Sequence, residues 1–333
     1  MVMGFGSVAK KVVATKIVAA DGSGDFTDIA TAVAALPAAG GVVYIKEGTY
    51  TLTASIIIDK DNVSIIGAGF CTKIVTTSNI AMISASEVDH IFLDKFYLYG
   101  DTTEANNIGI YFDDVSGATC RDLYIEKCGS HGISGVGGTY NLISGCVIYD
   151  CEGDNIHLDG TVTAGGVWTI AESLISTSSL NGIYTNDISQ IIISDTECSF
   201  NVNYGIYAQD SSSLIIGKCN VLANGYDGIK LVGYTSGIIN GNFSKYNDDA
   251  DVGNYSGIFL DASDNISITN NNCLGNSDYG INISNVTCDN TIVMGNNCRG
   301  NDVGQINDAG TNTLPNGVLG TTNLQLDDLN IIA

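Results

Sequence analysis

One six-residue phrase occurs eight times between residues 108 and 284 and restricts the fold more than any other feature of the sequence. Its first residues are separated by 23, 23, 27, 23, 23, 29 and 23 positions. Repeats of this length, with alternating apolar residues and no helical period, indicate a coil of short parallel strands in which each turn stacks on the last at about 4.8 Å. The two longer units predict loop insertions near Gly165 and from Asp248 to Asn254. The eight copies read IGIYFD, HGISGV, DNIHLD, NGIYTN, YGIYAQ, DGIKLV, SGIFLD and YGINIS.

Composition supports strands over helices. The chain has 40 glycines and only 2 prolines among 333 residues, so its turns are made by Gly, Asn and Asp, while Val, Ile, Thr and Tyr carry the strands. A leucine-rich repeat is excluded because its Leu-x-x-Leu-x-Leu frame is absent, and a propeller would need longer repeats of four strands. The sequence therefore predicts an all-β solenoid of parallel strands.

The ends of the chain depart from the repeat. The stretch DFTDIATAVAALP (25–37) predicts a short amphipathic helix, at about residues 27–36, that closes the open end of the first coil. We expect residues 1–16 to be an N-terminal extension, residues 17–310 to form the β-helix domain, and residues 311–333 to form a tail or a second cap.

The stretch DGSGDFTDIATAVAALPAAGGVVYIKEGTYTL (21–52), followed by the repeated phrase, resembles the pectin-lyase-like right-handed parallel β-helix superfamily. The resemblance covers roughly residues 17–310 and implies a right-handed, single-stranded parallel β-helix. Members of this superfamily include lyases, hydrolases, epimerases, esterases and phage tailspikes, so the resemblance does not select one activity.

Ten cysteines occupy repeated positions. Cys128 and Cys151 hold the same place in consecutive units, and Cys146 and Cys219 share another place. This pattern predicts an interior ladder of small apolar side chains. No CxxC pair occurs, which argues against zinc, and a disulfide between Cys128 and Cys151 stays open because stacked turns bring Cα atoms into bonding range.

Three columns of side chains follow if the isoleucine of each phrase points inward, because neighbouring residues of a strand alternate between its faces. The first outward column is Tyr111, Ser134, His157, Tyr184, Tyr207, Lys230, Phe259 and Asn282. The second is Asp113, Val136, Asp159, Asn186, Gln209, Val232, Asp261 and Ser284. The turn before each strand contributes Ile108, His131, Asp154, Asn181, Tyr204, Asp227, Ser256 and Tyr279.

These columns predict a carbohydrate-binding face. Aromatic rings cover the C–H surface of a sugar while carboxylates and amides bind its hydroxyls, although a ladder of tyrosines also packs well without a ligand. The candidate catalytic residues are His131, Asp154, His157, Asp159, Asp227 and Lys230. The candidate substrate-binding residues are Asn181, Tyr184, Asn186, Tyr204 and Tyr207.

Two chemistries fit these residues. Hydrolysis would use a carboxylate pair, Asp154 with Asp227 or Asp159 with Asp113. A lyase or epimerase would instead remove the proton next to a uronate carboxylate, with His157 or Lys230 as base and a tyrosine, Tyr184 or Tyr207, as proton donor.

A cation would stabilise the charge that develops in the second chemistry. Ca²⁺ held by Asp154 or Asp159 is the candidate, and no other cofactor is expected.

Comparison with superfamily motifs supports the place of the site rather than its reaction. Polygalacturonase-like members carry GDD, GHG and RIK, and this chain has GDN at 153–155, SHG at 130–132 and IK at 229–230. Here SHG precedes GDN, and Asn155 replaces the second aspartate. The pectin methylesterase stretches QDTL and LGRPW and the alginate epimerase motif YGFDPH are absent.

A formal charge of −23 makes nucleic acid an unsuitable partner, because phosphate binding needs clustered Lys and Arg. No run of 18 apolar residues predicts a membrane span. The sequence thus predicts a protein, monomeric or homotrimeric, that cleaves a polysaccharide or oligosaccharide in an extracellular, virion or cell-surface setting, although it shows no signal peptide. The alternative is a non-catalytic glycan-binding tailspike-like or surface fibre protein, whose trimer would bury a second, apolar outward column.

Overall fold

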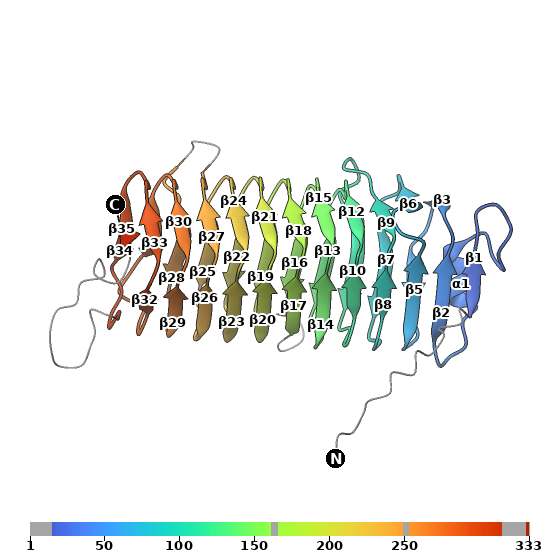
Figure 1. Cartoon of the computed structure of the whole chain (residues 1–333). Coiled ribbons are helices and arrows are strands. Elements are labelled where there is room, and N and C mark those ends of the chain that lie inside the picture. The colour runs from blue at the N-terminus through green and yellow to red at the C-terminus, as the bar shows by residue number, and fades with distance from the viewer. Residues whose placement is uncertain (1–14, 161–165, 249–252, 315–330, 333) are drawn as a thin grey trace, which may run out of the picture.

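The chain winds into a right-handed parallel β-helix (Figure 1). The computed structural model describes residues 15–160, 166–248, 253–314 and 331–332. Most of the expected N-terminal extension and C-terminal tail lies outside the described residues, as do the centres of both expected loop insertions. The all-β parallel fold predicted from the repeat is confirmed.

Each turn of the coil contributes strands to three parallel sheets, which we name by their first strand. The β1 sheet contains, in spatial order, β1 (Lys16–Val18), β2 (Gly41–Ile45), β5 (Val63–Gly67), β8 (Phe92–Asp94), β11 (Thr119–Arg121), β14 (Asn141–Ser144), β17 (Val167–Ala171), β20 (Gln190–Ser194), β23 (Ser213–Gly217), β26 (Gly237–Asn240), β29 (Ile266–Thr269) and β32 (Ile292–Met294). The β3 sheet contains β3 (Gly48–Leu52), β6 (Thr72–Thr76), β9 (Tyr97–Tyr99), β12 (Tyr124–Glu126), β15 (Val147–Tyr149), β18 (Leu174–Ser176), β21 (Glu197–Ser199), β24 (Asn220–Leu222), β27 (Phe243–Lys245), β30 (Asn272–Leu274), β33 (Asn297–Arg299) and β35 (Ile331–Ile332).

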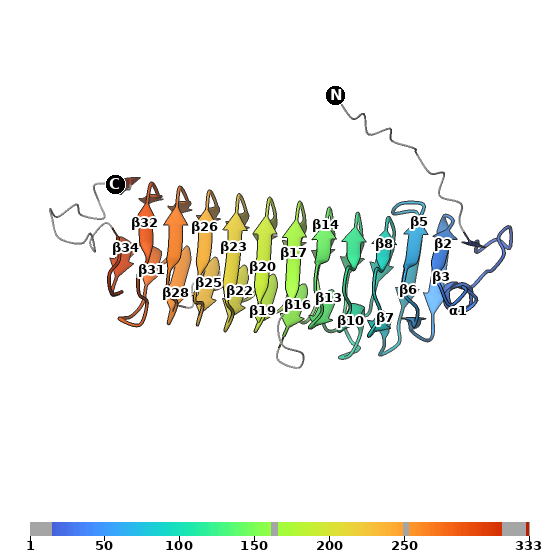
Figure 2. The ribbon, with the colours of Figure 1, turned by 90° about the horizontal axis from the view of Figure 1, so that it is seen from below.

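The β4 sheet carries the repeated phrases. From the N-terminal end it contains β4 (Ile56–Ile58), β7 (Ala81–Ser86), β10 (Ile108–Asp113), β13 (Ile133–Val136), β16 (Ile156–Asp159), β19 (Ile183–Asn186), β22 (Ile206–Gln209), β25 (Ile229–Val232), β28 (Ile258–Asp261), β31 (Tyr279–Ile283) and β34 (Gly304–Asp308). Strands of this sheet lie side by side in chain order (Figure 2).

The core is a stack of apolar side chains inside the coil. The isoleucine of every phrase, from Ile110 to Ile281, is fully buried, and consecutive ones are register partners. Burying a side chain of this size stabilises the fold by about 1.5–3 kcal/mol. Because each turn adds an equivalent layer, the core is continuous along the axis.

Asparagines hold the turns between the β3 and β4 sheets. Asn224 Oδ1 accepts from the backbone N–H of Asn201 at 3.1 Å, and Asn247 Oδ1 accepts from the side chain of Asn224 at 3.0 Å. The same ladder continues through Asn276 and Asn301. These buried amides accept hydrogen bonds from backbone N–H groups in the turns, which have no partner in a neighbouring strand.

The cysteines lie mostly inside this core. All ten are free thiols, and every one except Cys71 is buried. The contact with the neighbouring Cys151 thiol, together with burial, raises the pKa of the Cys128 thiol. The predicted interior ladder is therefore present, and Cys128 and Cys151 are not joined.

Helix α1 (Ile29–Ala34) lies at the N-terminal end of the coil (Figure 1). Asp28 caps it by accepting from the backbone N–H of Thr31 at 2.7 Å, and Ile29 and Val33 are buried against the first strands. Among the described residues, no helix is long and apolar enough to cross a membrane.

Candidate active site on the β4 sheet

The two outward columns deduced from the phrase are register columns of the β4 sheet. His157 pairs with Tyr184, Tyr184 with Tyr207, and Tyr207 with Lys230 on successive strands. Asp159, Asn186 and Gln209 align in the same way two residues later. Each of these side chains is half-buried. Two members of the first column differ, because Ser134 and Asn282 are buried.

Asp154 and Asp227, from the turns before β16 and β25, are almost completely buried, each at 3 % exposure. The reason is that each carboxylate binds the backbone of the next turn. Asp154 Oδ1 accepts from the backbone N–H of Asn181 at 2.9 Å and from its side-chain amide at 2.7 Å. The aspartates before these strands therefore belong to the coil's hydrogen-bond network as well as to its surface.

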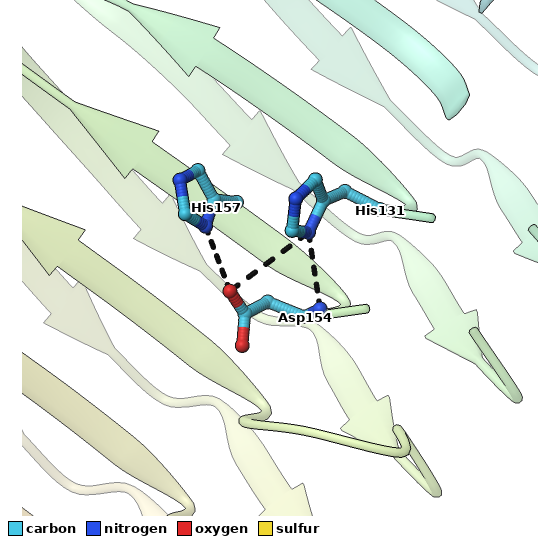
Figure 3. A group of neighbouring side chains, drawn as sticks. All are labelled: His131, Asp154 and His157. Carbon is cyan, nitrogen blue, oxygen red and sulfur yellow. Dashed lines mark hydrogen bonds and ion pairs between the residues drawn. The ribbon is translucent and has the colours of Figure 1, made fainter. Parts of the chain in front are cut away.

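Asp154 also binds His157. Its Oδ2 lies 2.7 Å from His157 Nδ1, as Figure 3 shows. Because an ionised carboxylate only accepts, we assign the proton of this bond to Nδ1, which leaves the lone pair of His157 on Nε2. A carboxylate that holds one imidazole nitrogen and frees the other for proton transfer is the arrangement of a general-base dyad.

His131 lies beside this dyad but plays a different part. Its Nδ1 accepts from the backbone N–H of Asp154 at 3.0 Å, and its ring stacks on His157 with centroids 4.3 Å apart. Burial, together with the neighbouring His157, lowers the pKa of His131 to about 4. His131 is therefore neutral at pH 7 and supports the position of the His157 ring from one side.

Tyr184 covers the other face of His157, with ring centroids 4.8 Å apart. Gln209 fixes the two tyrosines, because its amide donates to the Tyr184 hydroxyl at 2.9 Å and accepts from the Tyr207 hydroxyl at 2.7 Å. Burial raises the pKa of Tyr184 to about 12, so its phenol keeps its proton at neutral pH. Since Tyr184 accepts from Gln209, its own O–H can be donated to a ligand.

Lys230 lies further along the same strip. Its ammonium donates to the Tyr204 hydroxyl at 3.0 Å and lies over the rings of Tyr207 and Phe259, 5.5 and 5.2 Å from their centroids. Three strand steps, at about 4.8 Å each, separate β25 from β16. The structure therefore does not bring Lys230 and Asp227 together with Asp154 and His157, and they form a separate unit about 14 Å away.

Asp159 and Asn186 lie at the opposite ends of their strands from Asp154 and Asn181. The Asn186 amide donates to Asp159 Oδ1 at 3.3 Å. Five residues of extended chain separate Asp154 from Asp159, about 16 Å, so one ion cannot bridge them. Both oxygens of Asp154 already accept N–H groups, an arrangement that does not suit calcium. Calcium at Asp159 stays a prediction.

Three possible metal ligands do converge. One atom each of His131, Asp154 and His157 lies within 4.8 Å of the others (Figure 3). Two imidazoles and a carboxylate suit a transition metal better than calcium. Here the Nδ1 atoms of both histidines are already engaged in hydrogen bonds within the cluster.

The phrase-based columns missed two aromatic residues, Tyr226 and Tyr255. Their rings stack on each other at 4.5 Å, and Tyr226 makes an edge contact with Tyr204 at 5.2 Å. Each directly precedes a repeated phrase, and that shared position is the signal that could have identified them. They extend the aromatic strip from His131 to Tyr255.

Two family models match parts of the chain. The right-handed β-helix region matches residues 181–316, and the pectinesterase model matches residues 15–111. Pectinesterase 1 and Pectinesterase 3 of Solanum lycopersicum are each 37 % identical to the chain over 75 residues. These matches span 22 % of the chain and only 14 % of each pectinesterase.

Solved structures match over most of the chain at low identity. The A-module of the Azotobacter vinelandii mannuronan C-5 epimerase AlgE6 is 16 % identical with a TM-score of 0.61, covering 92 % of this chain and 94 % of that one. The periplasmic alginate epimerase AlgG is 14 % identical with a TM-score of 0.53, over 89 % and 78 %.

A phage structure is similar as well. The Dettilon tailspike protein is 15 % identical with a TM-score of 0.54, over 81 % of this chain and 62 % of that one. Together with the sheet topology, these similarities establish that the chain has a right-handed parallel β-helix fold.

Proposed function

We propose that the protein acts on a uronate-containing polysaccharide that lies along the β4 sheet, and that Asp154 and His157 remove the proton next to a uronate carboxylate. The observation that carries this proposal is the 2.7 Å bond between His157 Nδ1 and the buried Asp154 carboxylate, within a strip of aromatic rings. In the neutral imidazole, such a bond holds the proton on Nδ1 and leaves the lone pair on Nε2, the nitrogen that would act as the base.

In this mechanism His157 Nε2 takes the proton from C5 of the sugar, and the electron pair of the C–H bond forms an enediolate with the carboxylate. The pair then expels the sugar bonded through O4 and leaves a C4–C5 double bond. Tyr184 donates its phenolic proton to the departing oxygen, which its raised pKa permits at neutral pH. The overall reaction is a lyase cleavage.

Epimerisation is the second candidate. It is favoured by the structural similarity to a mannuronan C-5 epimerase module, which extends over 92 % of this chain. Its first step is the same removal of the C5 proton. The outcome differs only because a proton returns to the other face of the sugar and the O4 bond remains intact.

Hydrolysis is less well supported by the carboxylate spacing. Inverting hydrolysis needs two carboxyl groups about 6.5–9.5 Å apart, and retaining hydrolysis about 5–5.5 Å. Asp154 and Asp227 are separated by three strand steps, about 14 Å. The backbones of Asp159 and Asp113 are two steps apart, about 10 Å, and Asp113 Oδ2 accepts from Ser86 on β7, on the side away from β16.

A polysaccharide ligand agrees with the aromatic strip and with the printed functions of the similar proteins, which include pectinesterases, alginate epimerases and a tailspike. The periplasmic epimerase and the tailspike also support an extracellular or surface location for this chain.

The test compares the full chain with His157→Asn and His157→Gln on pectate, alginate and neutral polysaccharides in D₂O. Asn places an amide where Nδ1 binds Asp154 but offers no base, so this variant keeps the local hydrogen bond and loses proton abstraction. We expect unsaturated-uronide absorbance for cleavage, or deuterium at C5 without new chain ends for epimerisation, and loss of either signal in both variants.

Asp187→Asn, in an exposed turn, serves as the matched control. Reducing ends without unsaturated products would replace this mechanism with hydrolysis. Binding to a polymer with none of these signals would make the protein a glycan-binding fibre.

A further inference from the structure

A charge-free strip covers the outer face of the β1 sheet from β14 to β32, on a different side of the coil from the candidate active site. Its central register column runs along the solenoid axis and is mainly aliphatic. Seventeen outward side chains form the strip: Leu142, Ser144, Val167, Thr169, Ala171, Gln190, Ile192, Ser194, Ser213, Ile215, Gly217, Ile238, Asn240, Ser267, Thr269, Ile292 and Met294.

None of these seventeen residues is charged, although charged residues make up 15 % of the chain and normally lie on the surface. The aliphatic side chains are solvent-accessible: Ile215 is 37 % exposed, Ile238 46 % and Met294 47 %. An exposed apolar column of this kind on an otherwise acidic protein indicates a contact surface.

The surroundings of the strip argue against other occupants. It contains no aromatic ring on which a sugar could stack. Exposed acids border it at both ends of the strands, Glu172 and Asp195 on one side and Asp187 and Asp210 on the other. They outnumber Lys218, the exposed cation that follows β23 beside Asp195. These carboxylates would repel an anionic lipid surface or a polyanion.

We propose that this strip is the interface between two copies of the chain. The side chains of this flat face repeat at the spacing of the strands, so the same face of a second copy has side chains at the same spacing. When a patch pairs with the same patch on a second copy, the assembly stops at two chains. Seven strands of three to five residues form a face of about 34 by 14 Å. Pairing two such faces buries roughly 1,000 Å² in total, about the minimum for a specific interface. This proposal is independent of the activity proposed above.

The acidic margins add a testable property. In the dimer the margins of the two copies approach each other, so their repulsion opposes association at low salt, and screening by salt relieves it. Association through the apolar strip should therefore strengthen between about 0.05 and 0.5 M NaCl, whereas association through ion pairs would weaken.

The experiment measures the mass of the full chain in solution by sedimentation equilibrium at micromolar concentration. We expect twice the single-chain mass of 34.8 kDa. The double variant Ile215→Glu/Ile238→Glu should sediment as a single chain, because each interface would then bury four unpaired carboxylates. Circular dichroism and the thermal transition verify that the variant is folded.

Ile57→Glu is the matched control, since Ile57 is 63 % exposed on the β4 sheet and lies far from the strip. This variant should keep the wild-type mass. Carbene footprinting of the unmodified protein provides a second measurement, with the strip protected at high concentration and labelled on dilution. A single-chain mass at every salt concentration, or a larger mass that the double variant retains, would overturn the proposal.

Discussion

Two units of the coil share the phrase D-x-I followed by a nitrogen base, and they differ in what that base binds. Asp154 precedes His157 on β16, and Asp227 precedes Lys230 on β25. In both units the buried aspartate accepts the backbone N–H of the next turn, from Asn181 at 2.9 Å and from Ser256 at 2.6 Å. The backbone role of the aspartate is therefore the same in the two units.

The side chains create the difference. His157 is short and rigid and turns back to its own aspartate at 2.7 Å, whereas Lys230 extends to Tyr204 on another turn. Burial, with the carboxylates of Asp278 and Asp248 nearby, raises the pKa of Asp227 to about 7. One repeat position thus gives an orienting carboxylate in the first unit and a proton-holding carboxyl group in the second.

Asp154→Asn should have the largest effect of the substitutions that test this comparison. The amide oxygen can still accept from Asn181, but the amide nitrogen would now donate to His157 Nδ1 and hold the imidazole in the wrong tautomer. We expect turnover to fall by about 10³-fold or more, with little change in the thermal transition. Steady-state kinetics on the polysaccharide that the wild type converts measures this fall in turnover, and Asp187→Asn is the control. Activity within threefold of the wild type would remove the dyad from the mechanism.

Asp227→Asn should change stability with pH. Because the folded-state pKa of Asp227 is raised, its favourable contribution is complete below the unfolded pKa of about 3.9 and is lost as pH rises through 7. Because the amide that replaces the carboxyl group cannot ionise, the variant should be more stable than the wild type by about 4 kcal/mol at pH 8, from about three pKa units at about 1.4 kcal/mol each, and close to it at pH 4.

Urea denaturation at the two pH values measures this difference. Equal stability of wild type and Asp227→Asn at pH 8 would contradict the raised pKa of Asp227.

Tyr207→Ala should have the smallest effect. Tyr207 lies between the two units, contacts Tyr184 and Tyr204, and bonds to Gln209. We expect affinity for the polymer to fall roughly tenfold through loss of one ring of the strip. Tyr149→Ala on the β3 sheet is the control, and isothermal titration is the measurement. Equal affinity in both variants would assign Tyr207 to packing alone.

The repeat determined a large part of this structure. Eight phrases, most of them 23 residues apart, indicate stacked parallel turns. The alternation of side chains along a strand then fixes which residues point inward and which lie in the same column. Ile156 is buried and His157 aligns with Tyr184 for this reason alone. The succession of His157, Tyr184, Tyr207 and Lys230 could therefore be predicted before any coordinates were known.

Contacts between turns decided the rest. Strand periodicity does not set rotamers or the packing of turns, so it could not show that Asp154 bonds to His157, that Lys230 turns to Tyr204, or that Tyr226 stacks on Tyr255. Likewise, the charge-free strip became visible only when seven strands separated by 23 or more residues were placed side by side. Sequence spacing determines position along a coil, and only the folded chain determines which polar atoms lose water and must find partners there.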